Sequence, residues 1–210
     1  MTGPELSRRQ QNRVDALRAI HRAAYELTLQ DGPASATVEA ISRKAGVSAR
    51  TFFNYYRSKE DAVLGIHPPQ VRLEQLSALA QGGTRGLFNR VLTLMHEVVR
   101  DSIVDGSTFA HRKEIFDLLP ESKDRMRAHM SACESAVQEA IVSNFDTGIL
   151  QDEALKTQPD AQDSARALIV LAGSAFRFTY ERAPFDLLSP PVEKVAESVE
   201  IFNRILKETL

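Results

Sequence analysis

The apolar residues of this chain recur with a helical period along most of its length. The first such stretch is followed by Asp31-Gly32-Pro33, where the glycine tolerates a left-handed backbone and the proline cannot continue a helix. The spacing therefore predicts an amphipathic helix that ends near residue 31. Its apolar face consists of Val14, Leu17, Ile20, Ala24 and Leu27.

Two short helical patterns follow around a glycine turn. Val38, Ile41 and Ala45 share one face of the first pattern. Gly46 permits the left-handed turn after it, and Ser48 can cap the second helix. Two short helices joined by such a turn are the layout of a DNA-reading helix-turn-helix.

The second helix of this pair is expected from Ala49 to about Tyr56. Phe52 and Tyr56 are spaced i and i+4 and form its buried side. The sequence Ser58-Lys59-Glu60-Asp61 then matches a capping box and predicts the start of the next helix. Four side chains are left on the outside, where a major groove would lie: Arg50, Thr51, Asn54 and Tyr55.

Four motifs stand at a fixed spacing in this segment: Thr37, Gly46-Val47-Ser48, the aromatic-rich run Thr51-Phe52-Phe53-Asn54-Tyr55-Tyr56, and Ser58-Lys59-Glu60. With this spacing, about residues 13–65 resemble the DNA-binding domain of the TetR family of transcriptional regulators. The resemblance implies a helix-turn-helix DNA-binding domain over residues 1–65 and a ligand-binding and dimerisation domain over residues 66–210. One position departs from the family pattern, which usually has a phosphate-binding tyrosine where this chain has Phe53. We therefore expect Phe53 to pack, with Tyr55 as a substitute for the lost hydroxyl.

Beyond residue 65 the sequence predicts further helices and no strands. Gly65-Ile66-His67-Pro68-Pro69 breaks the helix begun at Ser58, and we place a domain boundary there. The expected fold class is all-α, with an N-terminal three-helix DNA-binding domain and a C-terminal helical bundle. The later helices are expected at 70–80, 84–103, 109–118, 121–145, 161–183 and 191–209.

The formal net charge of −2 conceals an asymmetry along the chain. Residues 1–60 carry ten Lys and Arg against six Asp and Glu, hence +4, whereas residues 61–210 carry 16 against 22, hence −6. A basic end on an acidic body suits contact with DNA phosphates, although charge alone fits an ordinary solvated surface equally well.

Composition excludes several other classes of protein. Hydrophobic residues make up 43% and charged residues 26% of the chain, as in a soluble globular protein. A single cysteine, Cys133, forms no internal disulfide. We find no signal peptide, and the longest apolar run, 167–176, is too short to span a membrane. We therefore expect a cytoplasmic protein with no membrane partner.

Arg50 is the best candidate to read a base, because a guanidinium can bond guanine O6 and N7 together; a phosphate contact is nearly as good an interpretation. Asn54 either pairs with adenine or is simply solvated, and Thr51 reaches a thymine methyl or a phosphate. The remaining residues of the expected interface are Ala49 at the start of the reading helix and four phosphate-positioning residues, Thr37, Ser48, Tyr55 and Lys59, whose alternative role is capping and surface packing.

The resemblance also implies an effector pocket inside the bundle and a homodimer formed by the last two helices. A small hydrophobic or amphipathic effector suits the pocket, although each lining residue can equally be plain core. The helical stripes of the last two helices can likewise complete the core of one subunit instead of pairing two. The expected pocket residues are Phe88, Leu92, Met95, His96, Phe116, Met126, His129, Met130, Phe176, Arg177 and Tyr180. The expected dimer residues are Leu168, Ala172, Ala175, Val195, Val199, Phe202, Ile205 and Leu206.

No catalytic motif is present, so we expect neither an enzyme nor a cofactor. His129 and Cys133 have the i, i+4 spacing of metal ligands but lack a third ligand, so no metal site is expected. The sequence therefore indicates a transcriptional regulator, expected to be a repressor released from a palindromic operator by its effector. The alternatives are a helical module that binds small molecules or partners without specific DNA recognition, and a small all-α enzyme.

Overall fold

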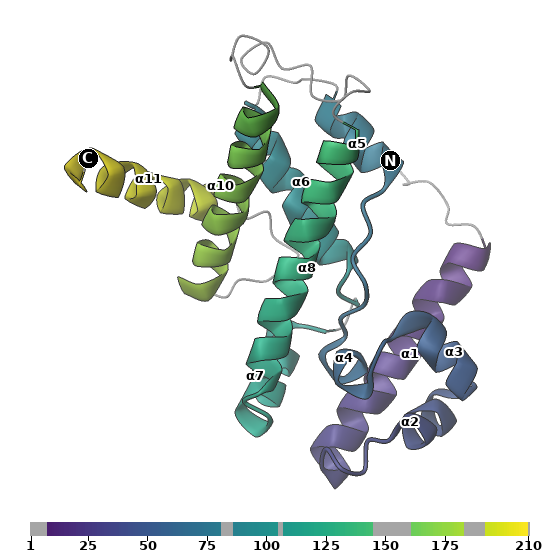
Figure 1. The fold of residues 1–210 in the computed structure, drawn as a ribbon. Helices are drawn as coiled ribbons and strands as arrows, with labels where there is room; N and C mark the ends of the chain where they lie inside the picture. Colours follow the sequence, from purple (N-terminus) through teal and green to yellow (C-terminus); the bar gives the residue numbers. More distant parts are fainter. Residues whose placement is uncertain (1–7, 81–85, 105–106, 145–160, 183–191, 210) are drawn as a thin grey trace. The chain divides into compact units, whose positions relative to one another are not determined.

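The computed structural model of the protein describes residues 8–80, 86–104, 107–144, 161–182 and 192–209. Within these residues the regular structure is helical, apart from one isolated bridge between Ile66 and Ile103 (Figure 1). The all-α expectation is confirmed. None of the described helices combines the length and apolar character needed to cross a membrane.

The chain divides into two compact units, the first made of Met1–Pro68 and Ser102–His129. Here α1 packs against α2 and α4, α2 against α3, and α4 against α7. Figure 1 shows α2, α3 and α4 gathered beside α1. The helices of this unit are α1 (Arg8–Asp31), α2 (Val38–Ala45), α3 (Ala49–Tyr55), α4 (Lys59–Leu64), α7 (Phe109–Leu118) and the first part of α8 (Ser122–Ser143).

Local sequence signals fix the ends of the three short helices. Thr37, Ser48 and Ser58 cap α2, α3 and α4: each side-chain oxygen accepts a hydrogen bond from the backbone N–H three residues later, at 3.2, 3.0 and 3.1 Å. Gly46 and Gly65 end α2 and α4 with left-handed φ angles of 70° and 69°. The predicted caps and turn are confirmed.

A small apolar core holds α1 to α4 together. α1 contributes the face that the helical period predicts, and α3 contributes Phe52 and its C-terminal cap Tyr56. The buried side chains are Leu17, Ile20, Ala23, Ala24, Ile41, Phe52, Tyr56, Ala62, Val63 and Leu64.

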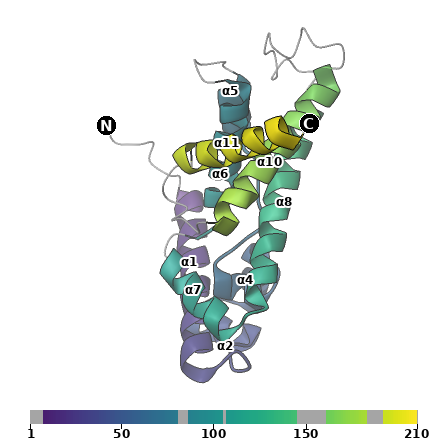
Figure 2. The same cartoon turned by 90° about the vertical axis from the view of Figure 1, so that its left-hand side faces the viewer.

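The second unit consists of Pro69–Asp101 and Met130–Leu210. α6 packs against α5, α10 and α11, and α10 packs against α11. Figures 1 and 2 both show α11 running across α10 at a steep angle. The helices are α5 (Leu73–Ala80), α6 (Leu87–Asp101), the rest of α8, α10 (Ala161–Arg182) and α11 (Val192–Thr209).

The helix predicted over 84–103 ends earlier, at Asp101, for a tertiary reason. The carbonyl of Ser102 accepts a hydrogen bond from the N–H of His67 at 2.9 Å, and the N–H of Val104 donates to Gly65 at 2.8 Å. These bonds draw residues 102–104 into the first unit and replace the helical bonds they would otherwise make. The first unit thus includes 102–129 as well as the N-terminal helices; a division of function at residue 65 stays a prediction.

Candidate nucleic-acid interface

α3 presents a polar outer face and buries its opposite side. Arg50 and Asn54 are exposed, and Thr51 and Tyr55 are partly exposed. Phe52, which lies between them in sequence, is completely buried. The seven-residue helix therefore carries the predicted base-reading side chains on its solvent side.

Tyr56 anchors the end of α3 to α1. Its hydroxyl donates a hydrogen bond to the carbonyl of Leu17 at 2.9 Å, and its ring lies 5.9 Å from that of Phe52. Burial, and then the negative charge of Asp61, raise the pKa of Tyr56 above its ordinary value, so the phenol keeps its proton and remains a donor. The outer face of α3 is thus held on a fixed support.

Several of the predicted DNA-contacting side chains also make hydrogen bonds within the protein. The hydroxyls of Ser48 and Thr51 lie 2.9 Å apart, so the side chain of Thr51 reinforces the cap of its own helix. The ammonium of Lys59 donates to the carbonyl of Pro33 at 3.0 Å and ties α4 to the loop after α1. These groups hold the helix-turn-helix in shape, whatever else they bind.

The expectation that Phe53 packs inside is wrong. Its side chain is 59% exposed, and its ring meets Phe52 edge-on with centroids 5.3 Å apart. The reason is geometric: successive residues of a helix point about 100° apart, so when Phe52 faces the core its neighbour cannot.

Three arginines of the helix-turn-helix segment have exposed side chains. Arg43, Arg50 and Arg57 are exposed on α2, on α3 and directly after α3. Lys44 pairs with Glu26 of α1 at 3.0 Å, which offsets its charge. Exposed guanidinium groups on a helix-turn-helix favour contact with the DNA backbone and with guanine edges.

A comparison with known protein families finds a match to the same segment of the chain. The family model of the bacterial regulatory proteins of the tetR family matches residues 20–64, from the middle of α1 to the last residue of α4. The protein carries a DNA-binding domain of the TetR family of transcriptional regulators. No curated protein matches the chain. The matched segment is the TetR-family DNA-binding domain, and the chain is a DNA-binding transcriptional regulator.

Sequence analysis missed the contacts that fix the end of α4 in this TetR-family domain. The buried ring of His21 donates from Nδ1 to the carbonyl of Ala62 at 2.8 Å, and the hydroxyl of Ser107 donates to Leu64 at 2.7 Å. Burial lowers the pKa of His21, partly offset by this backbone bond, so the ring is neutral. A Cβ on Gly65 would lie 2.7 Å from Cβ of Ser107. Glycine is therefore required at position 65 both by the left-handed turn and by the close approach of Ser107.

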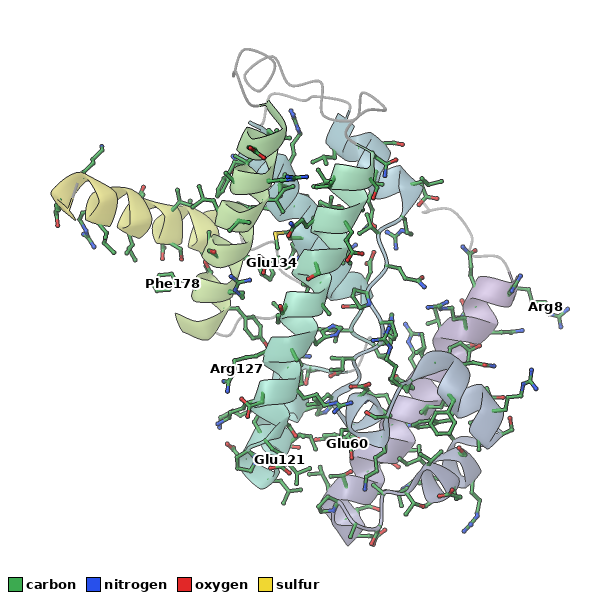
Figure 3. All side chains as sticks on the ribbon, in the orientation of Figure 1. Arg8, Glu60, Glu121, Arg127, Glu134 and Phe178 are labelled. Atoms are coloured by element: carbon green, nitrogen blue, oxygen red, sulfur yellow. The ribbon has the colours of Figure 1, made fainter. Side chains whose placement is uncertain are left out.

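Arg125 of α8 contacts the first turn of α4. Its Nε donates to the carboxylate of Asp61 at 2.7 Å, and its Nη2 donates to the hydroxyl of Ser58 at 2.5 Å. The hydrogen bond to Asp61 raises the pKa of Arg125. The pair is separated by 64 positions in sequence, and no periodic pattern signals it. In Figure 3 the labelled residues Glu60, on α4, and Glu121, just before α8, mark the two segments that this contact joins.

The expected effector-pocket residues lie in both units. Phe116, Met126 and His129 belong to the first unit, and the other expected residues belong to the second. Nε2 of His129 lies 2.8 Å from the hydroxyl of Ser102, and burial lowers the pKa of His129 to about 4. Within their units, Phe88, Phe116, Arg177 and Tyr180 are half-buried, whereas Leu92, Met95, His96, Met126, His129, Met130 and Phe176 are buried.

An ion pair missed by sequence analysis lies in the second unit. Glu134 of α8 points toward α10, where it pairs with Arg177 (Figure 3). The Glu134 side chain is only 13% exposed, and Gly173 of α10 leaves the space that it occupies. Among the residues that the structure describes, no three His, Cys, Asp or Glu side chains converge as a metal site.

The residues expected at the dimer interface differ in their exposure. Leu168 and Val199 are half-buried, and Ile205 is half exposed. Ala172 and Ala175 are completely buried within the second unit, because their small side chains allow close packing of α10; they have no surface to offer a partner subunit. The side chains of Val195, Phe202 and Leu206 lie outside the described residues.

Sequence analysis missed the exposed apolar residues of α10. Val170 and Leu171 are 49% and 45% exposed. They lie two residues and one residue before Ala172, so the face that α10 presents to solvent is rotated from the expected dimer face of Leu168, Ala172 and Ala175.

Proposed function

We propose that this TetR-family regulator is a cytoplasmic repressor that binds a palindromic operator as a homodimer and leaves it when a small hydrophobic or amphipathic effector binds. The observation that carries the proposal is the outer face of α3, where exposed Arg50 and Asn54 are held on a capped helix anchored through Tyr56. A reading helix needs this combination of free side chains and fixed backbone.

Base reading falls to Arg50 and Asn54 in this proposal. Arg50 donates to guanine O6 and N7, and Asn54 pairs with N6 and N7 of adenine one turn later, each contact worth about 1–3 kcal/mol of discrimination. Thr51 and Ala49 lie against the DNA beside them. Thr37, Ser48, Tyr55 and Lys59 position the phosphates, which sets the register without reading sequence.

Dimerisation through α10 and α11 is supported by their exposed apolar side chains. Val170, Leu171 and Ile205 leave about half of their surface in solvent. Leu168 and Val199 are half-buried in a single subunit and can lose their remaining exposure in a dimer. A two-fold axis would place two reading helices on two half-sites about 34–36 Å apart, which makes the operator palindromic.

An effector site in the second unit is supported by its apolar interior and by an ion pair between a mostly buried glutamate and a partly exposed arginine. Met95, Met130 and Phe176 offer adaptable apolar surface. The Glu134–Arg177 pair places both a carboxylate and a guanidinium beside that interior. An amphipathic effector can exchange its polar end for one partner of the pair while its apolar end is buried.

The mechanism requires the effector to bind the DNA-released form better than the DNA-bound form. Thermodynamic linkage then demands that operator DNA weaken effector binding by the same factor. Independent binding of effector and operator to the purified protein would contradict this mechanism.

The test begins by enriching duplexes from a random pool with the full-length protein. Affinities for the enriched duplex and for a scrambled one are then compared at several salt concentrations, since phosphate-driven binding is salt-labile. We expect selective binding of two subunits per duplex, and about a 5- to 150-fold loss of selectivity per half-site in Arg50→Ala. Arg127→Ala, an exposed arginine on α8, is the matched control and should bind normally. Failure to enrich any sequence would indicate a helical module without specific DNA recognition.

A further inference from the structure

Phe53 is an exposed aromatic ring in the middle of the reading face of α3. We propose that Phe53 reads sequence by packing against the C5-methyl group of thymine in the major groove. The inference rests on the proposed DNA-binding function and adds an apolar reader to the polar ones. It assigns to Phe53 a specificity role in place of the phosphate contact that a tyrosine hydroxyl would make.

The position of the ring supports this role. Phe53 lies three residues after Arg50 on α3, so the two side chains follow one side of the helix, and both are exposed. The ring leaves 59% of its surface in solvent and meets Phe52 only at an edge. A large apolar surface is therefore kept free on the side of the helix that carries Arg50.

Charge and apolar character together indicate which group of the DNA the Phe53 ring contacts. The guanidinium group of Arg50, on the same side of the helix, attracts a polyanion and brings it to this face. The phenyl ring has no hydrogen-bonding group, so it gains nothing from a phosphate oxygen or from the polar edges of guanine, cytosine and adenine. The thymine methyl is the apolar group that B-DNA displays in the major groove, and phenylalanine is suited to contact it.

The experiment removes that methyl without changing base pairing. The full-length protein enriches a duplex from a random pool, and each thymine of the enriched site is replaced in turn by deoxyuridine. We expect one position per half-site at which wild-type affinity falls about fourfold, equivalent to about 0.8 kcal/mol for one buried methyl group. In Phe53→Ala the same replacement should have no effect.

Two controls separate this role from a structural one. Asn54→Ala, at the neighbouring exposed position, should keep the fourfold methyl effect while losing affinity for the enriched site. Thermal unfolding of Phe53→Ala should match the wild type, because the ring is exposed. The deoxyuridine scan on the wild-type protein remains a test of the methyl contact even if a variant fails to fold.

The outcomes distinguish this inference from the function on which it rests. A selective site in which no thymine methyl matters, or in which Phe53→Ala keeps the methyl effect, overturns the role of Phe53 and leaves the DNA-binding function intact. An enriched site without thymine at the contacted positions also overturns the role of Phe53 and leaves the DNA-binding function intact. No enrichment of any sequence overturns both.

Discussion

Adjacent tyrosines at the end of α3 provide a direct test of how the interface is built. Tyr56 is buried, with its hydroxyl bonded to the carbonyl of Leu17 at 2.9 Å, whereas Tyr55 is partly exposed on the outer side. Replacing each by phenylalanine removes one oxygen from the same kind of side chain. We expect opposite effects: Tyr56→Phe lowers stability, and Tyr55→Phe lowers DNA affinity.

The magnitude for Tyr56→Phe follows from its contacts. The ring keeps its packing, and the Leu17 carbonyl keeps the bond that it makes within α1, so the change removes one buried hydrogen bond and creates no cavity. Such a bond contributes about 0.5–1.5 kcal/mol to the free energy of unfolding. For a chain of this size, a loss of about 1 kcal/mol lowers Tm by roughly 2–4 °C. Affinity for the enriched duplex should stay within about twofold of wild type.

For Tyr55→Phe the free energy of unfolding should be nearly unchanged, because the side chain is partly exposed. Loss of one phosphate hydrogen bond should weaken binding of the enriched duplex about 2- to 10-fold. Denaturant unfolding followed by circular dichroism, and fluorescence anisotropy with labelled duplex, measure the two quantities. The reasoning is refuted if Tyr56→Phe is as stable as wild type, or if Tyr55→Phe binds DNA normally.

Two further predictions concern stability. Gly65→Ala should lower the free energy of unfolding at least twice as much as Gly46→Ala: both glycines have left-handed φ, which costs about 1–2 kcal/mol with a side chain, but only at Gly65 would the methyl collide with Ser107. Equal losses in denaturant unfolding would contradict the proposed packing. Burial lowers the pKa of His129 to about 4, against about 6.5 in an unfolded chain, so below pH 6.5 the unfolded state binds a proton that the folded state does not. Wild-type stability should therefore fall by ~2 kcal/mol more than that of His129→Asn between pH 7 and pH 5; parallel pH curves would refute this.

The reading face and its caps were predictable from the sequence because the signals are local. Capping serines, a left-handed glycine and the i, i+4 pair Phe52 and Tyr56 each act within four residues. They define where the short helices begin and end and which side of α3 is buried. The position of Phe53 was also determined locally, but we gave more weight to its apolar character than to the helical period.

The buried and exposed faces of α10 could not be read from its composition. Ala172 and Ala175 suggested a close contact between helices, but a stripe of small residues does not say whether the partner helix belongs to the same subunit. The folded chain buries both alanines internally and leaves Val170 and Leu171 in solvent.

The sequence by itself therefore determined the all-α fold class, the helix-turn-helix and the exposed face of α3, because these depend on residues within one or two turns of each other. Only the tertiary structure decided which distant groups support that face. Arg125 reaches Asp61 and Ser58, and the segment at Ser107 closes on Gly65, across separations of more than 40 residues. Such contacts arise from the packing of whole helices, and a periodic pattern specifies a face without specifying its partner.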